Sequence, residues 1–139
     1  MKMIIVLVAS ALAFSGAMQA ATNDADVFKA RREALMKKLD GGVAVIYGAT
    51  DDSGGIVKGQ FVQESSFYYL TGISEPGAAL LLAPGERRYK EILFLQPRNP
   101  EVENWDGRRE PLGDALDEAT GFEKVLRINA LPANLTAML

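Results

Sequence analysis

The sequence predicts a mixed α/β domain, and two kinds of pattern support this prediction. Apolar residues recur at helical spacing over 27–39, and a shorter helical pattern covers 112–120. A continuous apolar run of strand length occupies 43–47, and two further strand-like segments occupy 78–82 and 91–95, of which the second begins with Glu91. Helical and strand-like segments follow one another along the chain, which favours helices packed on a sheet.

The first expected helix runs from about Val27 to Leu39, with Asp24 or Asp26 as its N-cap. Its apolar positions recur near helical spacing, and the aliphatic stem of Arg31 can cover apolar surface beside them. The helix is therefore expected to pack one face against the rest of the domain.

Glycines 41–42 are expected to end this helix. The apolar run 43–47 that follows predicts a strand buried on both faces. The runs 78–82 and 91–95 flank Pro84-Gly85, so we expect a hairpin with a longer turn.

The last third of the chain predicts two helices and a strand. Residues 112–120 form a short helix that Gly121 ends, and 125–128 form a strand. Pro132 suits the first turn of a final helix, in which the apolar pattern continues to Leu139. A helix in an α/β unit normally leads to a further strand. We therefore expect the domain to be truncated at its C-terminal end, as a fragment or as the product of a truncated gene.

Residues 1–20 have the layout of a secretory signal peptide. Lys2 precedes an apolar run over 4–14, and small residues follow over 15–21. We expect cleavage after Ala20, with 15–17 as the other candidate cleavage segment, and export to the periplasm or beyond. The alternatives are an uncleaved membrane anchor or a buried strand. The remaining 21–139 is expected to form the folded domain, without a membrane attachment.

Composition excludes several chemistries. The 139 residues include no Cys and no His, which excludes disulfides, thiolate nucleophiles and Ser-His-Asp catalysis. Lys2 is the only charged residue of 1–20, so the rest of the chain has 14 basic and 18 acidic residues, a net charge of −4. This balance gives no basic surface for nucleic acid.

The carboxylates do not form a catalytic or metal-binding pattern. We interpret each acidic cluster as solvated surface, since the residues either lack a fixed shared face or repeat like charges on one helix face. We therefore name no catalytic residue and no metal ligand. The clusters are Asp51 with Asp52, then Glu101, Glu103 and Asp106, and finally Asp114, Asp117 and Glu118.

An aromatic cluster lies at 67–70. If this segment is a strand, Phe67 and Tyr69 share one face, and Tyr68 and Leu70 share the other. We expect the cluster to pack in the core, while the tyrosine hydroxyls could still reach a partner. Glu75, just before a proline, could accept backbone donors in a turn.

Four separated motifs, in order, resemble one family. They are the stretch FVQESSFYYLTGISEPGA at 61–78, Leu93-Phe94-Leu95, the spaced set Glu103, Trp105, Gly107 and Arg109, and a helix with its glycine at 115–121. Together they resemble the N-terminal domain of aminopeptidase P, the Xaa-Pro aminopeptidase, over about 27–139. The sequence departs from the family pattern at Glu64, where Asn or Asp is usual, and at Val62, where Arg is common.

The resemblance implies a layered α/β/α fold with a mixed sheet, related to the N-terminal domains of creatinase and prolidase. It also implies a two-domain enzyme that removes the residue before an N-terminal proline. In the family a C-terminal pita-bread domain carries two Asp, one His and two Glu around two metal ions, usually Mn²⁺. That domain is absent from this sequence, so the chain is expected to bind no cofactor by itself.

The resemblance also suggests what an N-terminal domain contributes. Trp105 matches a tryptophan that lines a substrate entrance formed with a neighbouring subunit, and Arg109 is expected to contact a domain or subunit neighbour. Tyr69 is the third candidate for substrate access or subunit contact. Proline-containing peptides, met through the full-length enzyme, and further copies of the chain are the expected partners. The alternatives are a free-standing peptide-binding or interaction domain, or a remnant of a disrupted gene.

Overall fold

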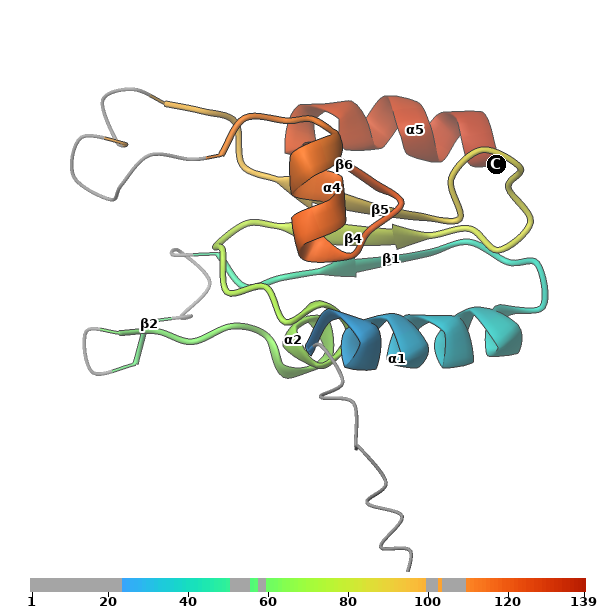
Figure 1. Ribbon diagram of the computed structural model, residues 1–139, viewed down its shortest axis with the longest axis horizontal. Coiled ribbons are helices and arrows are strands. Elements are labelled where there is room, and N and C mark those ends of the chain that lie inside the picture. The colour runs from blue at the N-terminus through green and yellow to red at the C-terminus, as the bar shows by residue number, and fades with distance from the viewer. Residues whose placement is uncertain (1–23, 51–55, 58–59, 100–102, 104–109) are drawn as a thin grey trace, which may run out of the picture.

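The computed structural model describes residues 24–50, 56–57, 60–99, 103 and 110–139 (Figure 1). A four-stranded sheet in the order β1-β4-β5-β6 lies between helices α1 and α2 on one face and α5 on the other. This arrangement confirms the α/β prediction and the layered fold with a mixed sheet. The elements are α1 (Asp24–Leu39), β1 (Ala44–Tyr47), β2 (Ile56–Val57), β3 (Gln60–Phe61), α2 (Ser65–Thr71), β4 (Ala79–Leu82), β5 (Glu91–Leu95), α4 (Asp114–Thr120), β6 (Lys124–Arg127), the 3₁₀ turn η2 (Ile128–Ala130) and α5 (Leu131–Met138).

The sheet is mixed because only its last pair is parallel. β4 runs antiparallel to both β1 and β5, with Leu82 opposite Ala44 on one side and Glu91 on the other. β6 runs parallel to β5, with Val125 opposite Leu93. A parallel pair needs a crossover connection, and α4 lies in the connection between these two strands. The predicted hairpin of β4 and β5 and the strand and helix that follow it are confirmed.

Alternation along the central strands divides the core into two clusters. Neighbouring residues of a strand point to opposite faces, so Leu80 and Leu93 pack toward α1 and α2, while Leu81 and Phe94 pack toward α5. Every residue of β4 and β5 is buried. The two central strands therefore hold the helices of both faces together.

β1 differs from the prediction that it is buried on both faces. Its first three residues are half-buried, and Tyr47 is 60% exposed. β1 is an edge strand of the sheet, and the helix α5 that covers the opposite face follows β6 at the other edge. A continuous apolar run thus indicated a strand correctly but overstated its burial.

α2 corrects the interpretation of the aromatic cluster as a core strand. Ser65–Thr71 is a helix in which Phe67 and Leu70 are buried, whereas Tyr68 and Tyr69 are 46% and 56% exposed. The Glu64 carboxylate caps the helix by accepting the N–H of Phe67 at 2.7 Å. Two of the three aromatic residues are therefore available on the surface.

Gly72 ends α2 in a left-handed conformation with φ +69°. A side chain there would be strained, and its Cβ would collide with the ring of Phe28 in α1. The N–H of Gly72 donates to the carbonyl of Tyr68 at 2.8 Å. The glycine therefore both ends α2 and lets α1 pack closely against it.

The Glu64 cap predicts a pH-dependent stability. The N–H groups of Ser66 and Phe67 hold the pKa of the Glu64 carboxyl below its usual value. Glu64→Ala is expected to lower the free energy of unfolding by about 1 kcal/mol at neutral pH. A lowered pKa means that this contribution is complete above the unfolded-state value of about 4.3, and is lost as the pH falls through the folded-state value.

Urea titrations of the wild type and Glu64→Ala at a series of pH values measure this effect. Glu64→Gln is the matched control, because its side-chain oxygen still accepts a hydrogen bond but carries no titrating charge. A stability difference between wild type and Glu64→Ala that stays constant into strong acid would contradict the assignment of the cap to the ionised carboxylate.

Asp117 corrects the interpretation of its acidic cluster as solvated. Only 9% of the residue is exposed, and its carboxylate accepts hydrogen bonds from Lys124 Nζ at 2.6 Å and from the N–H of Val125 at 2.8 Å. These bonds attach α4 to the start of β6. Glu103 forms an ion pair with Arg98 at 3.0 Å. The candidates Asp51, Asp52, Glu101 and Asp106 lie outside the described residues.

Candidate functional site

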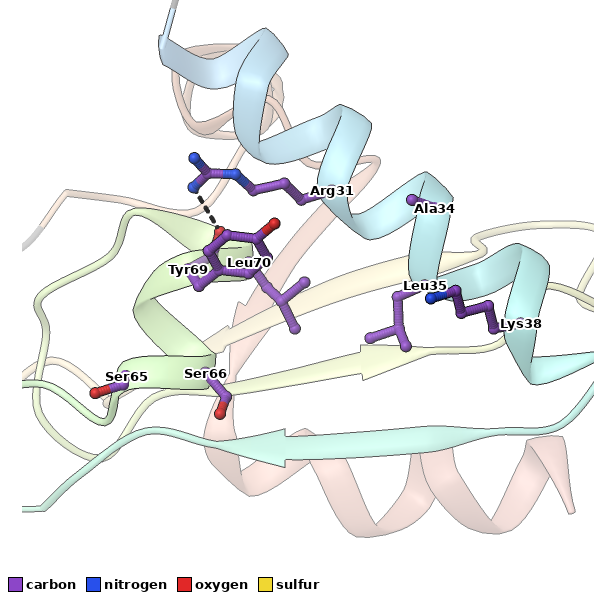
Figure 2. Close-up of a pocket in the computed structure, with 8 residues that line it drawn as sticks. All are labelled: Arg31, Ala34, Leu35, Lys38, Ser65, Ser66, Tyr69 and Leu70. Atoms are coloured by element: carbon purple, nitrogen blue, oxygen red, sulfur yellow. Dashed lines mark hydrogen bonds between the residues drawn. The ribbon is translucent and has the colours of Figure 1, made fainter.

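Tyr69 is the only one of the three candidate site residues that lies in the described part of the chain. Trp105 and Arg109 fall outside it, so the structure neither brings them to Tyr69 nor separates them from it. Tyr69 lies on the side of α2 that faces α1, beside Arg31 (Figure 2). The site is therefore built from these two helices.

A groove of about 590 Å³ lies between α1 and α2 at Tyr69. A second hollow of about 470 Å³ continues it toward the start of α1, beside Val27 and Ala30. A third, of about 530 Å³, lies beside Val62 at the start of α2. Arg31 and Tyr69 line all three hollows. The residues of the first groove are Arg31, Ala34, Leu35, Lys38, Ser65, Ser66, Tyr69 and Leu70 (Figure 2).

Arg31 and Tyr69 form the wall that these hollows share. Arg31 Nη1 donates to the carbonyl of Tyr69 at 2.9 Å, and the guanidinium carbon lies 4.2 Å from the centroid of the Tyr69 ring (Figure 2). The same guanidinium is 5.3 Å from the ring of Phe28. Cation–π contacts at exposed sites contribute about 0.5–1 kcal/mol. The aromatic ring of Tyr69 is thereby held in place while more than half of the residue stays exposed.

Arg32, the next residue along α1, holds the two helices of the groove in place from the buried side of α1. Its side chain is fully buried and forms a two-pronged ion pair with Glu91 of β5, with Nε–Oε2 2.7 Å and Nη2–Oε1 3.1 Å. Nη1 donates to the carbonyl of Leu70 at 3.1 Å, and Nη2 to that of Gly121 at 2.9 Å. The guanidinium also stacks on Phe122 at 3.9 Å. One side chain thus fixes α1 to β5 and to the C-terminal ends of α2 and α4.

Sequence reasoning missed Arg32, although a signal was present. The residue lies four positions after Phe28 and three before Leu35, on the face that packs inward. A charged side chain at such a position implies a buried partner. The partner itself, Glu91, is 59 residues away and belongs to an apolar strand, so only the fold identifies it.

The groove offers binding groups rather than a reactive centre. Its walls supply an aromatic ring, aliphatic side chains, two cations and three hydroxyl groups. Among the described residues, no three His, Cys, Asp or Glu side chains come close enough to hold a metal ion. The geometry favours contact with another molecule or domain.

Comparison with known proteins identifies the family of this chain. The model of the aminopeptidase P N-terminal domain family matches residues 28–139 of this chain. The chain belongs to this family.

Relatives of this aminopeptidase P domain are much longer proteins. The Xaa-Pro aminopeptidase of Haemophilus influenzae is 57% identical over 49 residues, which are 35% of this chain and 11% of that protein. The Xaa-Pro aminopeptidase of Escherichia coli is 31% identical over 116 residues, which are 81% of this chain and 26% of that protein. The chain therefore spans about a quarter or less of the length of the curated relatives it matches.

Solved structures agree with this assignment. The aminopeptidase PepP of Pseudomonas aeruginosa superposes with a TM-score of 0.68 at 30% identity, covering 82% of this chain and 26% of that one. Escherichia coli aminopeptidase P with the inhibitor Pro-Leu gives a TM-score of 0.68 at 28% identity, covering 83% and 27%. The layered fold of the aminopeptidase P domain is thus shown by both sequence and structure.

The longest family motif proves to be largely a folding element. Gln63 Oε1 accepts the N–H groups of Ala49 at 2.6 Å and Glu64 at 2.8 Å, while its Nε2 donates to the carbonyl of Glu75 at 3.0 Å. The Glu75 carboxylate accepts the N–H of Gln96 at 3.0 Å, as expected of a turn residue. Glu64, a departure from the family pattern, still caps α2.

No helix in the described segments is long and apolar enough to span a bilayer.

Proposed function

We propose that this chain is the N-terminal, non-catalytic part of an exported Xaa-Pro aminopeptidase, where it serves subunit contacts and substrate access. The match of residues 28–139 to the aminopeptidase P N-terminal domain carries this proposal. The named relatives are Xaa-Pro aminopeptidases in which the matched part is at most about a quarter of the length. Export is proposed from the signal-like pattern of 1–20.

The peptidase chemistry is assigned to a part of the enzyme outside this sequence. Two Mn²⁺ ions, which the family resemblance implies, would activate water and polarise the scissile carbonyl. The residues here do not fit such a centre, because the chain has no His and its described carboxylates do not cluster. We therefore derive no catalytic step from this chain.

The decisive experiment joins the chain to a catalytic part. With added Mn²⁺, the chain alone is expected not to cleave an Xaa-Pro peptide. A chimaera in which it replaces the matching quarter of the Escherichia coli enzyme is expected to cleave it. Turnover by the chain alone in proportion to its concentration would overturn the placement of the chemistry. A folded but inactive chimaera would contradict the proposed role.

The same chimaera tests substrate access. Trp105→Ala is expected to raise KM several-fold and to leave kcat nearly unchanged, because a stacking surface away from the reacting atoms contributes to binding alone. Trp105→Phe keeps an aromatic ring and is the matched control. An unchanged KM in Trp105→Ala would remove Trp105 from the substrate entrance.

A free-standing peptide-binding domain is the second candidate, and the exposed groove at Tyr69 favours it. It predicts that the chain alone binds proline-containing peptides, with loss of binding in Tyr69→Ala. Isothermal titration calorimetry separates the two candidates, since the enzyme-part proposal expects no such binding without a catalytic domain.

A further inference from the structure

The outer face of α1 carries a row of exposed residues with opposite charges at its two ends. Asp26, Ala30, Ala34 and Lys38 follow one another at intervals of four residues and are all exposed. Residues four apart lie one above the other on the same side of a helix, so these four form a continuous ridge. The two alanines at its centre leave room for the close approach of another backbone.

Neither end of this ridge has an ion-pair partner in the described part of the chain. The ion pairs there join Arg32 with Glu91, Arg98 with Glu103, and Lys124 with Asp117. Asp26 and Lys38 are thus open to pairing with another molecule.

The ridge is complementary to itself under a two-fold axis. Along the helix axis, the midpoint of the ridge lies between Ala30 and Ala34, at the level of residue 32, which is six residues from Asp26 and six from Lys38. A two-fold axis at that level makes two α1 helices antiparallel and places Asp26 of each copy opposite Lys38 of the other. It also places Ala30 opposite Ala34, so small side chains meet small side chains. A two-fold interface requires such a self-complementary surface.

The neighbouring ridge of α1 lacks this property. Lys29, Glu33 and Lys37 are also exposed and also four residues apart. A two-fold axis at its midpoint would place Glu33 opposite Glu33, and Lys29 opposite Lys37. Like charges would therefore face each other throughout. Of these two ridges, the one from Asp26 to Lys38 is the one that can pair with itself.

Uncovered apolar surface lies directly beside the self-complementary ridge. The hollows of about 590 and 470 Å³ extend along it on the side of α2, and Val27 and Tyr69 are 36% and 56% exposed there. Removing such surface from water is the main driving force of association. The charges at the ridge ends then fix the register and the antiparallel direction.

From these observations we infer that the partner of the α1 face is a second copy of this chain, bound through antiparallel α1 helices about a two-fold axis. This inference specifies the subunit contact of the proposed function and rests on that part of it alone. It does not depend on the peptidase assignment.

Charge exchange tests the inference on the full chain by sedimentation velocity, at concentrations up to about 200 µM. The wild type is expected to dimerise. D26K and K38D each turn two attractive pairs into two repulsive ones, so each is expected to weaken dimerisation by about tenfold or more. An equimolar mixture of D26K and K38D is expected to restore a dimer, because every facing pair in the mixed species is again opposite in charge.

D24K and K29D are the matched controls. They make the same kinds of charge change on the same helix, but Asp24 and Lys29 point away from the ridge, so both variants are expected to dimerise as the wild type does. A monomeric wild type at the highest concentration, or a mixture that fails to restore dimers while both variants are folded by circular dichroism, would overturn the inference. Cleavage by the chimaera is a separate readout, so failure of the dimer and failure of the peptidase assignment are distinguishable.

Discussion

Arg32→Met is expected to lower the free energy of unfolding by about 3–5 kcal/mol, because it leaves the buried Glu91 carboxylate without its cation. The substitution also removes the donors to the carbonyls of Leu70 and Gly121. Domains of this kind are stable by about 5–15 kcal/mol in total. The variant is therefore expected to be close to unfolding at 37 °C. The effect is large because Arg32 and its partner are both buried.

Urea denaturation followed by circular dichroism measures this effect, and Lys29→Met is the matched control on the exposed face of the same helix. The double variant Arg32→Met with Glu91→Leu is expected to recover part of the loss, because it buries no unpaired charge. Recovery is incomplete because the two carbonyls still lack their donor. A loss below about 1 kcal/mol in Arg32→Met would contradict the view that this ion pair holds the layers together.

Phe67→Ala is the second large effect, again about 3–5 kcal/mol of unfolding free energy. Phe67 is fully buried in the cluster that α1 and α2 form with the sheet, where it packs with Leu80 and Leu93. The truncated side chain leaves a cavity that the buried central strands cannot fill. Loss of stability is expected to be accompanied by loosening of α2, whose inner face Phe67 and Leu70 provide.

Tyr68→Ala is the matched control for Phe67→Ala, because it removes a neighbouring aromatic side chain that is 46% exposed. Its edge-to-face contact with Phe28, at 6.3 Å between ring centroids, limits the expected loss to about 1 kcal/mol. Thermal or urea unfolding compares the two variants directly. Equal losses in both would contradict the burial pattern of α2 and favour a strand-like arrangement of the segment.

The sheet and the terminal helices could be predicted because their signals are local. Apolar segments indicated β4 and β5, and glycines marked the ends of α1 and α4. α2 could not be predicted in this way, since its seven residues include three consecutive aromatic residues that also suit a strand. Its helical state depends on the Glu64 cap and on burial of the face that carries Phe67 and Leu70, which a sequence pattern does not display.

One residue of the groove, Tyr69, is a candidate from the sequence, whereas the geometry around it is not. Tyr69 was expected to contact a partner, but the groove around it forms only because α1 lies beside α2, and Arg31 reaches a carbonyl 38 residues away. Asp117 was misjudged for the same reason, because its partners lie in β6, outside its own helix. Side chains whose partners are distant in sequence are assigned correctly only once the fold is known.

The contact of Arg32 with Gly121 joins residues 89 positions apart. An N-terminal helix could in principle fray and reclose independently of the rest of a domain. Here, opening α1 would break bonds to β5, to the end of α2 and to the end of α4 at once. The inner amides of α1 should therefore exchange with solvent only when the whole domain unfolds, which makes α1 part of the most cooperative unit of the domain.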